Sequence, residues 1–101
     1  MIIYNVTTRV ATAVFEGWLD WMRSVHIPEI MATGLITEHK IVRLLDVEED
    51  EGPTIAVQYY LKSYDDYEKY IADHSDRLRL SSYEKWGDRV ISFRTVMEVI
   101  N

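Results

Sequence analysis

The stretch LITEHKIVRLLDVEEDEGPTIAVQYYL, residues 35–61, decides the fold of this chain. Apolar and polar residues alternate over 35–47 and again over 54–61. This pattern predicts two β-strands, because successive side chains of a strand point to opposite faces of a sheet. The residues between them, Glu-Glu-Asp-Glu-Gly-Pro at 48–53, are polar and turn-forming. We therefore expect an antiparallel hairpin with a long acidic tip.

On the amino-terminal side of this hairpin, the sequence predicts a strand followed by a helix. Residues 2–8 alternate with period two, and apolar residues then recur at helical spacing from Ala11 to Val25. The helix is expected to end or kink near Ile27, because Pro28 disfavours helical geometry in the residue before it. Pro28 can then open a short second helical turn, which a glycine at position 34 would cap.

On the carboxyl-terminal side, a second helix and a last strand are expected. Ser63 is a favourable N-cap, and two aspartates follow in the first turn. The helix should run to Trp86, with a break near His74 or Ser75, and a strand should cover residues 89–100. The order βαββαβ is that of the ferredoxin-like α+β fold, a four-stranded antiparallel sheet with two helices on one face.

The length and composition limit the class of protein. The 101 residues leave room for one domain, residues 1–101, and the absence of cysteine excludes disulfides and thiolate metal sites. A net charge of −6 without a basic cluster argues against nucleic-acid binding. No apolar run approaches the ~18 residues of a membrane span, and no signal peptide is recognisable. We expect a cytoplasmic protein that does not associate with membranes.

Two helices can cover only one face of such a sheet, so the other face needs a separate explanation. The residues expected toward the helices are Ile55, Val57, Tyr59, Leu61, Ile91, Phe93 and Met97. The opposite face would then mix apolar Ile3, Ala56, Tyr60, Val90 and Val96 with polar Asn5, Gln58, Ser92, Arg94 and Glu98. This face is apolar for contact with water, so we expect a homodimer in which a second sheet covers it. A monomer with a half-solvated sheet is the alternative.

Several short segments carry a resemblance to a known group of proteins. They are Met1–Thr7, Trp18-Leu-Asp-Trp-Met22, Val25-His-Ile-Pro-Glu29, Thr33-Gly34, Gln58-Tyr59 and Phe93-Arg-Thr95. Across nearly its whole length the chain resembles an uncharacterised bacterial family within the dimeric α/β-barrel superfamily. The resemblance implies a ferredoxin-like dimer with a cleft between sheet and helices. Members of that superfamily include cofactor-free monooxygenases, lactone isomerases, haem-degrading enzymes and stress-response proteins, but no catalytic motif of theirs matches here.

An aromatic cluster is the first candidate for a binding site. An apolar pocket lined by rings suits a flat apolar or aromatic ligand. The predicted lining consists of Trp18, Trp21, Met22, Tyr4, Tyr59 and Phe93. Ordinary core packing is the alternative, because aromatic residues at helical spacing are usually core residues.

His26 is the one candidate catalytic residue. It falls at the edge of the apolar arc of the first helix, where the end of the helix would favour a protonated ring. It could serve as a general base or as a hydrogen-bond donor to an enolisable substrate. The alternative is a structural histidine bonded to a backbone carbonyl or to Glu29.

The remaining polar residues predict no metal and no cofactor. The spacing of His26, His39 and His74 fits no metal-binding motif, and the acidic tip does not match a calcium loop. Arg43 and Arg94 are isolated cations in apolar strands, and each could bind a carboxylate or a phosphate with two hydrogen bonds. Pairing with Glu98, Asp46 or the partner chain is the alternative that we expect.

Three functions are therefore open: a cofactor-independent monooxygenase or isomerase, a non-catalytic ligand-binding or sensor protein, and a purely structural interaction module. A cavity of at least ~300 Å³ beside His26 would favour the first two over the third.

Overall fold

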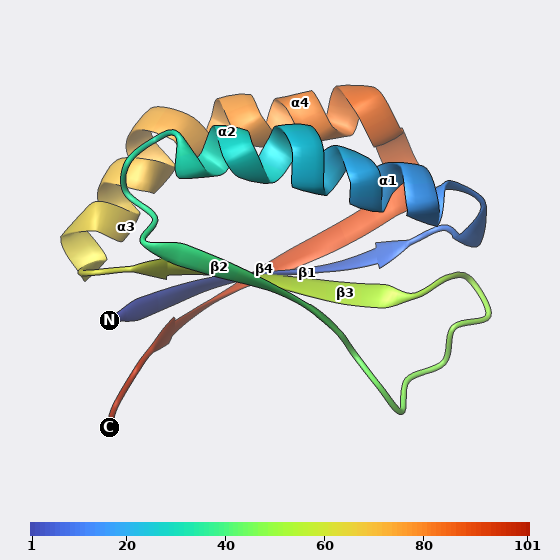
Figure 1. Cartoon of the computed structure of the whole chain (residues 1–101), viewed down its shortest axis with the longest axis horizontal. Coiled ribbons are helices and arrows are strands. Elements are labelled where there is room, and N and C mark those ends of the chain that lie inside the picture. Colours follow the sequence, from blue (N-terminus) through green and yellow to red (C-terminus); the bar gives the residue numbers. More distant parts are fainter.

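The computed structural model describes all 101 residues and confirms the βαββαβ order of the ferredoxin-like fold (Figure 1). The four strands are β1 (Ile2–Val10), β2 (Glu38–Arg43), β3 (Thr54–Leu61) and β4 (Val90–Glu98). Two long helical segments connect them. The first comprises α1 (Phe15–Trp21), a π-helical turn (Met22–His26) and α2 (Ile27–Met31). The second comprises α3 (Tyr64–Tyr70), a π-helical turn (Ile71–Ser75) and α4 (Asp76–Trp86).

The strands form one antiparallel sheet in the order β2-β3-β1-β4. Both helical segments lie on the same face of this sheet, and the other face is uncovered (Figure 1). The structure therefore has a helix layer and a sheet layer, as the sequence predicts. We call the two sides of the sheet the covered face and the uncovered face.

The register identifies which residues of the central strands face the helices. Tyr4 lies opposite Tyr59, and Val6 lies opposite Val57, on the covered face. The prediction for β3 is confirmed, because Ile55, Val57, Tyr59 and Leu61 are all buried there. Together with Trp18, Ile27, Ile30, Tyr70, Leu78 and Trp86 of the helices, they belong to the hydrophobic core.

The prediction for β4 is wrong, because the strand has the opposite phase. Val6 of the covered face pairs with Arg94, whereas Thr7 of the uncovered face pairs with Phe93. The uncovered face of β4 therefore carries Ile91, Phe93 and Met97, and its covered face carries Val90, Ser92, Arg94, Val96 and Glu98. Both sides of this strand contain large apolar residues, so alternation alone does not show which side faces the helices. The pairing of β4 with β1 determines it.

The irregularity predicted near Ile27 is a π-helical turn, and the short second turn predicted to open at Pro28 is α2. The backbone N–H of Ile27 bonds to the carbonyl of Met22, five residues earlier, which is the hydrogen bond of a π-helical turn. In a regular α-helix the ring of Pro28 would collide with the carbonyl four residues before it. The wider turn places Pro28 in the first turn of α2 instead, so the segment continues to Met31.

The second helix begins as predicted. The hydroxyl of Ser63 accepts a hydrogen bond from the backbone N–H of Asp66 at 3.2 Å, which caps α3. The irregularity expected near His74 or Ser75 is a second π-helical turn rather than a break.

The hairpin between β2 and β3 has an exposed tip, although β2 is shorter than the predicted 35–47. Arg43 and Glu49 close the tip with two hydrogen bonds, at 2.6 and 3.1 Å. Gly52, with a φ of +123°, is required there, because a Cβ would collide with the carbonyl oxygen of Val10. None of the helices has the length and hydrophobicity needed to cross a membrane.

Candidate functional site

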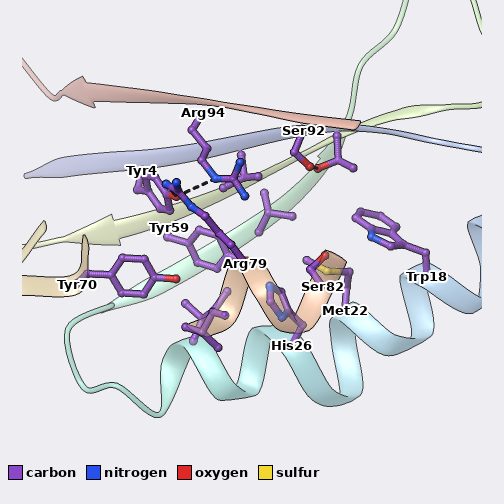
Figure 2. Close-up of a pocket in the computed structure, with 15 residues that line it drawn as sticks. Tyr4, Trp18, Met22, His26, Tyr59, Tyr70, Arg79, Ser82, Ser92 and Arg94 are labelled. Atoms are coloured by element: carbon purple, nitrogen blue, oxygen red, sulfur yellow. Dashed lines mark hydrogen bonds between the residues drawn. The ribbon is translucent and has the colours of Figure 1, made fainter. Parts of the chain in front are cut away.

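A cavity of about 50 Å³ lies between the helix layer and the covered face of the sheet (Figure 2). All the main elements except β2 contribute to it. Its lining residues are Tyr4, Val6, Thr8, Trp18, Met22, His26, Ile30, Val57, Tyr59, Tyr70, Leu78, Arg79, Ser82, Ser92 and Arg94. The lining contains arginines, hydroxyl groups and one histidine, but no carboxylate.

Five of the seven residues predicted from the sequence come together in this lining. Tyr4, Trp18, Met22, His26 and Tyr59 all line the cavity. Their binding role stays a prediction.

The other two predicted residues lie elsewhere. Trp21 does not line the cavity but stacks on the ring of His26, with the two ring centroids 4.6 Å apart and the ring planes 20° from parallel. Phe93 lies on the uncovered face and is 63% exposed, so its predicted place in the lining is wrong. The reason is the reversed phase of β4, which turns the neighbouring Arg94 toward the cavity instead.

His26 is buried, with 9% of its surface exposed, and its Nδ1 has no hydrogen-bond partner. The bond to a backbone carbonyl or to Glu29 that a structural role would require is therefore missing at this atom. Burial, and secondarily the positive charge of Arg94, lowers the pKa of His26 from 6.5 to about 4. The prediction of a protonated ring is thus corrected: His26 is neutral at neutral pH, because its helix continues past it and the ring is desolvated.

Two arginines meet at a single tyrosine hydroxyl at one side of the cavity. Arg79 of α4 donates to the Tyr4 hydroxyl at 3.1 Å, and Arg94 of β4 donates to the same oxygen at 3.1 Å. Figure 2 shows both side chains converging on Tyr4 from different elements. The structure forms salt bridges at Arg9 and Arg43 but at neither of these two arginines. Arg94 therefore has no carboxylate partner in its own chain, whereas Arg43 pairs with Glu49. Pairing of Arg94 with a partner chain stays a prediction.

Two further tyrosines border the cavity and keep their protons. Burial raises the pKa of Tyr59 and of Tyr70 well above the ordinary value of 10. Both phenols are therefore neutral at neutral pH and can act as hydrogen-bond donors.

Sequence reasoning missed Arg79, Tyr70, Ser82 and Ser92 as lining residues. Arg79 and Arg94 are 15 positions apart in the chain, on a helix and a strand, so no spacing motif connects them. The available signal was the pair of polar residues, Ser92 and Arg94, at alternate positions of the first half of β4.

The first π-helical turn contributes to the cavity lining, and the second follows a lining residue in the chain. The first includes Met22 and His26, and the second directly follows Tyr70. Such turns are rare and occur frequently at functional sites, because the extra residue redirects side chains.

The cavity is smaller than the ~300 Å³ expected of a pocket for a drug-sized ligand. A volume of about 50 Å³ is nevertheless larger than the ~10–15 Å³ that one water molecule requires. The cavity therefore does not reach the size that would favour the two ligand hypotheses. The core is not closed, but a large aromatic molecule does not fit in it.

The other histidines lie outside the cavity. His39 is exposed on β2, and Nδ1 of His74 lies 3.0 Å from a guanidinium nitrogen of Arg77. No group of three histidine, cysteine, aspartate or glutamate side chains is gathered in a metal-binding arrangement.

The family described as "Domain of unknown function (DUF4286)" matches residues 1–100 of this chain. The chain belongs to the DUF4286 family. None of the curated proteins matches this DUF4286 chain.

Solved structures with the same fold come from several sources. A dimeric ferredoxin-like protein from an uncultured marine organism has a TM-score of 0.70 and 12% identity, covering 99% of the DUF4286 chain and 95% of its own. An "ethyl tert-butyl ether d (ethd)" family protein from Bacillus halodurans has a TM-score of 0.68 and 12% identity, covering 99% and 100%. A protein from Agrobacterium tumefaciens has a TM-score of 0.55 and 18% identity, covering 95% and 91%. At these identities the likeness establishes the fold alone.

Proposed function

We propose that this DUF4286 protein is a homodimer that binds a small organic molecule in the cavity beside His26. The observation that carries the proposal is a cavity of about 50 Å³ whose lining combines His26, two arginines and several hydroxyl groups with apolar side chains. A small organic molecule with both polar and apolar parts would be complementary to such a lining.

Binding is favoured over catalysis by the chemistry of the same histidine. A general base works best when its pKa lies near the working pH. The pKa of His26 is lowered to about 4, so the ring is a weak base and a suitable neutral hydrogen-bonding group. The monooxygenase and isomerase hypotheses would need a bound substrate to raise that pKa.

The homodimer is supported by the uncovered face of the sheet. Phe93 and Ile91 of β4 are 63% and 55% exposed, and Val42 of β2 is 40% exposed on the same face. A similar structure, the protein from the marine organism, is described as dimeric. A second copy of this face would remove the three side chains from water without leaving a free sheet face.

The dimer and the cavity share the strand β4. Phe93 points to the uncovered face, and Ser92 and Arg94 on either side of it point to the cavity. Contacts of a second copy with Phe93 would therefore fix the position of β4 and with it the position of Arg94 at the cavity.

Native mass spectrometry of gently purified protein tests both parts together. We expect a dimer whose mass exceeds that of two chains by the mass of a small molecule. In His26→Gln, which removes the imidazole ring, we expect a smaller fraction of the dimer to retain this molecule. His39→Gln is the matched control, because His39 is exposed and lies away from the cavity.

Each outcome has a distinct meaning. A monomer at micromolar concentration would refute the dimer. A dimer that neither retains a small molecule nor responds to added ones would favour the structural interaction module.

A further inference from the structure

We infer that the cavity takes a small carboxylate, bound by the guanidinium groups of Arg79 and Arg94 at its mouth. This inference rests on the proposed function, since it specifies the chemical class of the ligand for the same cavity.

The first argument is the unbalanced positive charge. Arg79 and Arg94 donate to one oxygen, that of the Tyr4 hydroxyl, and neither forms a salt bridge. The chain has 17 acidic and 11 basic residues, so carboxylates are in excess, yet none lines the cavity. The charge of Asp76 acts on Arg79, but the two residues form no salt bridge. Two cations that share one acceptor and form no salt bridge are a site for an anion.

The second argument is the supply of hydrogen-bond donors. Both arginines use the oxygen of Tyr4 as acceptor, which leaves its O–H proton free to donate to a ligand. Tyr59 and Tyr70 also line the cavity as protonated phenols. Hydroxyl and guanidinium donors around one space are complementary to an acceptor-only group such as a carboxylate.

The third argument distinguishes a carboxylate from a phosphate. Most of the remaining lining is apolar and includes Met22, Ile30, Val57 and Leu78. A phosphate has acceptor oxygens on all sides, and some would face these apolar side chains without a partner. A carboxylate is planar, fits the guanidinium fork, and carries its acceptors at one end, so that an apolar tail can contact the apolar lining.

The fourth argument concerns size and access. At ~10–15 Å³ for each water-sized group, about 50 Å³ holds roughly three to five non-hydrogen atoms. A short acid such as propionate has this size. Arg79 and Arg94 are both exposed residues, so the charged groups can reach an anion that enters from solvent.

The test is a titration of the full-length protein with propionate, in which the NMR chemical shifts of Trp18 and Met22 report binding. Propionamide is the matched probe, because it has the same shape without the charge, and inorganic phosphate is the competing anion. We expect propionate to bind at least tenfold more tightly than either. Arg79→Gln and Arg94→Gln should each weaken propionate binding about tenfold, whereas Arg23→Gln, on the exposed side of its helix, should change it less than twofold.

Contrary results separate the inference from the proposed function. Equal binding of propionate and propionamide, or unchanged affinity in both arginine variants, would leave a ligand cavity but refute the carboxylate site. Tighter binding of phosphate would refute it as well. No response to any probe at millimolar concentration would count against both. Arg79 lies on the surface of α4, so Arg79→Gln remains informative even where Arg94→Gln disturbs the fold.

Discussion

The covered and uncovered faces of the sheet differ most at β3 and β4. On β3, the covered face consists of buried apolar residues such as Val57 and Tyr59. On β4, the covered face carries Ser92 and Arg94, whereas the uncovered face carries Ile91 and Phe93. The side of β4 that lines the cavity is therefore polar, and the side that would contact the proposed partner is apolar. Burial under the helix layer alone would give the opposite distribution.

The largest expected effect comes from a charge on the uncovered face. Phe93→Asp would place one unpaired carboxylate from each copy in the proposed interface, where a buried unpaired charge costs several kcal/mol. We expect dimer affinity to fall by roughly a thousandfold, measured by sedimentation equilibrium. Leu45→Asp is the control, because Leu45 lies near the hairpin tip and is 79% exposed. An unchanged dimer in Phe93→Asp would mean that the uncovered face is not the interface.

The next effect concerns the apolar part of the covered face. Leu61 is completely buried on β3, and Leu61→Ala would leave a cavity in the core. We expect the free energy of unfolding to fall by about 3–4 kcal/mol, measured by urea denaturation at fixed protein concentration. Leu45→Ala should change it by less than about 0.5 kcal/mol. Similar losses in the two variants would contradict the assignment of the core.

A pH-dependent effect of up to about 3 kcal/mol is expected from His26. In the unfolded chain this histidine takes up a proton near pH 6.5, but in the folded chain it stays neutral down to about 4. The unfolded state thus binds more protons in this window, so stability is lost as the pH falls from 6.5 to about 4.

Unfolding free energies measured across this pH range for the wild type and for His26→Gln would test the linkage. The variant should lose the part of the slope that His26 contributes. His39→Gln should keep the wild-type slope, because His39 is exposed. Parallel slopes in the wild type and His26→Gln would show that His26 is not desolvated.

The smallest effect is expected at the polar part of the covered face. The hydroxyls of Thr8 and Ser92 form a hydrogen bond of 2.7 Å. Ser92→Ala should cost about 1 kcal/mol, because it leaves the buried Thr8 hydroxyl without this partner. The double variant Thr8→Val, Ser92→Ala should recover most of the loss. Thermal unfolding would measure both, and an additive double variant would mean that the two hydroxyls do not interact.

The order of the elements could be predicted from the sequence because each one has a strong local signal. The alternation from Ile55 to Leu61 identifies β3, and Ser63 identifies the start of α3. The phase of β4 could not be predicted, because Val90 and Val96 on one side balance Ile91 and Phe93 on the other. Pairing with β1 decides between them, and pairing is not local information.

The candidate site could be predicted only in part for the same reason. Trp18, Met22 and His26 share one helix and follow its periodicity, so the sequence brought them together. Arg79 and Arg94 meet through the packing of α4 against the sheet. The π-helical turn at Met22–His26 also has no sequence signal beyond Pro28, which predicts an end or a kink but not the type of turn.

The reversed polarity of β4 has a consequence for protein engineering. A redesign scored only on the isolated chain would exchange the exposed Phe93 for a polar residue and Arg94 for an apolar one. Such a sequence would gain solubility and core packing as a monomer. It would also erase the proposed dimer interface and the charge at the mouth of the cavity in one step, so consensus or stability optimisation of this protein should leave residues 91–94 untouched.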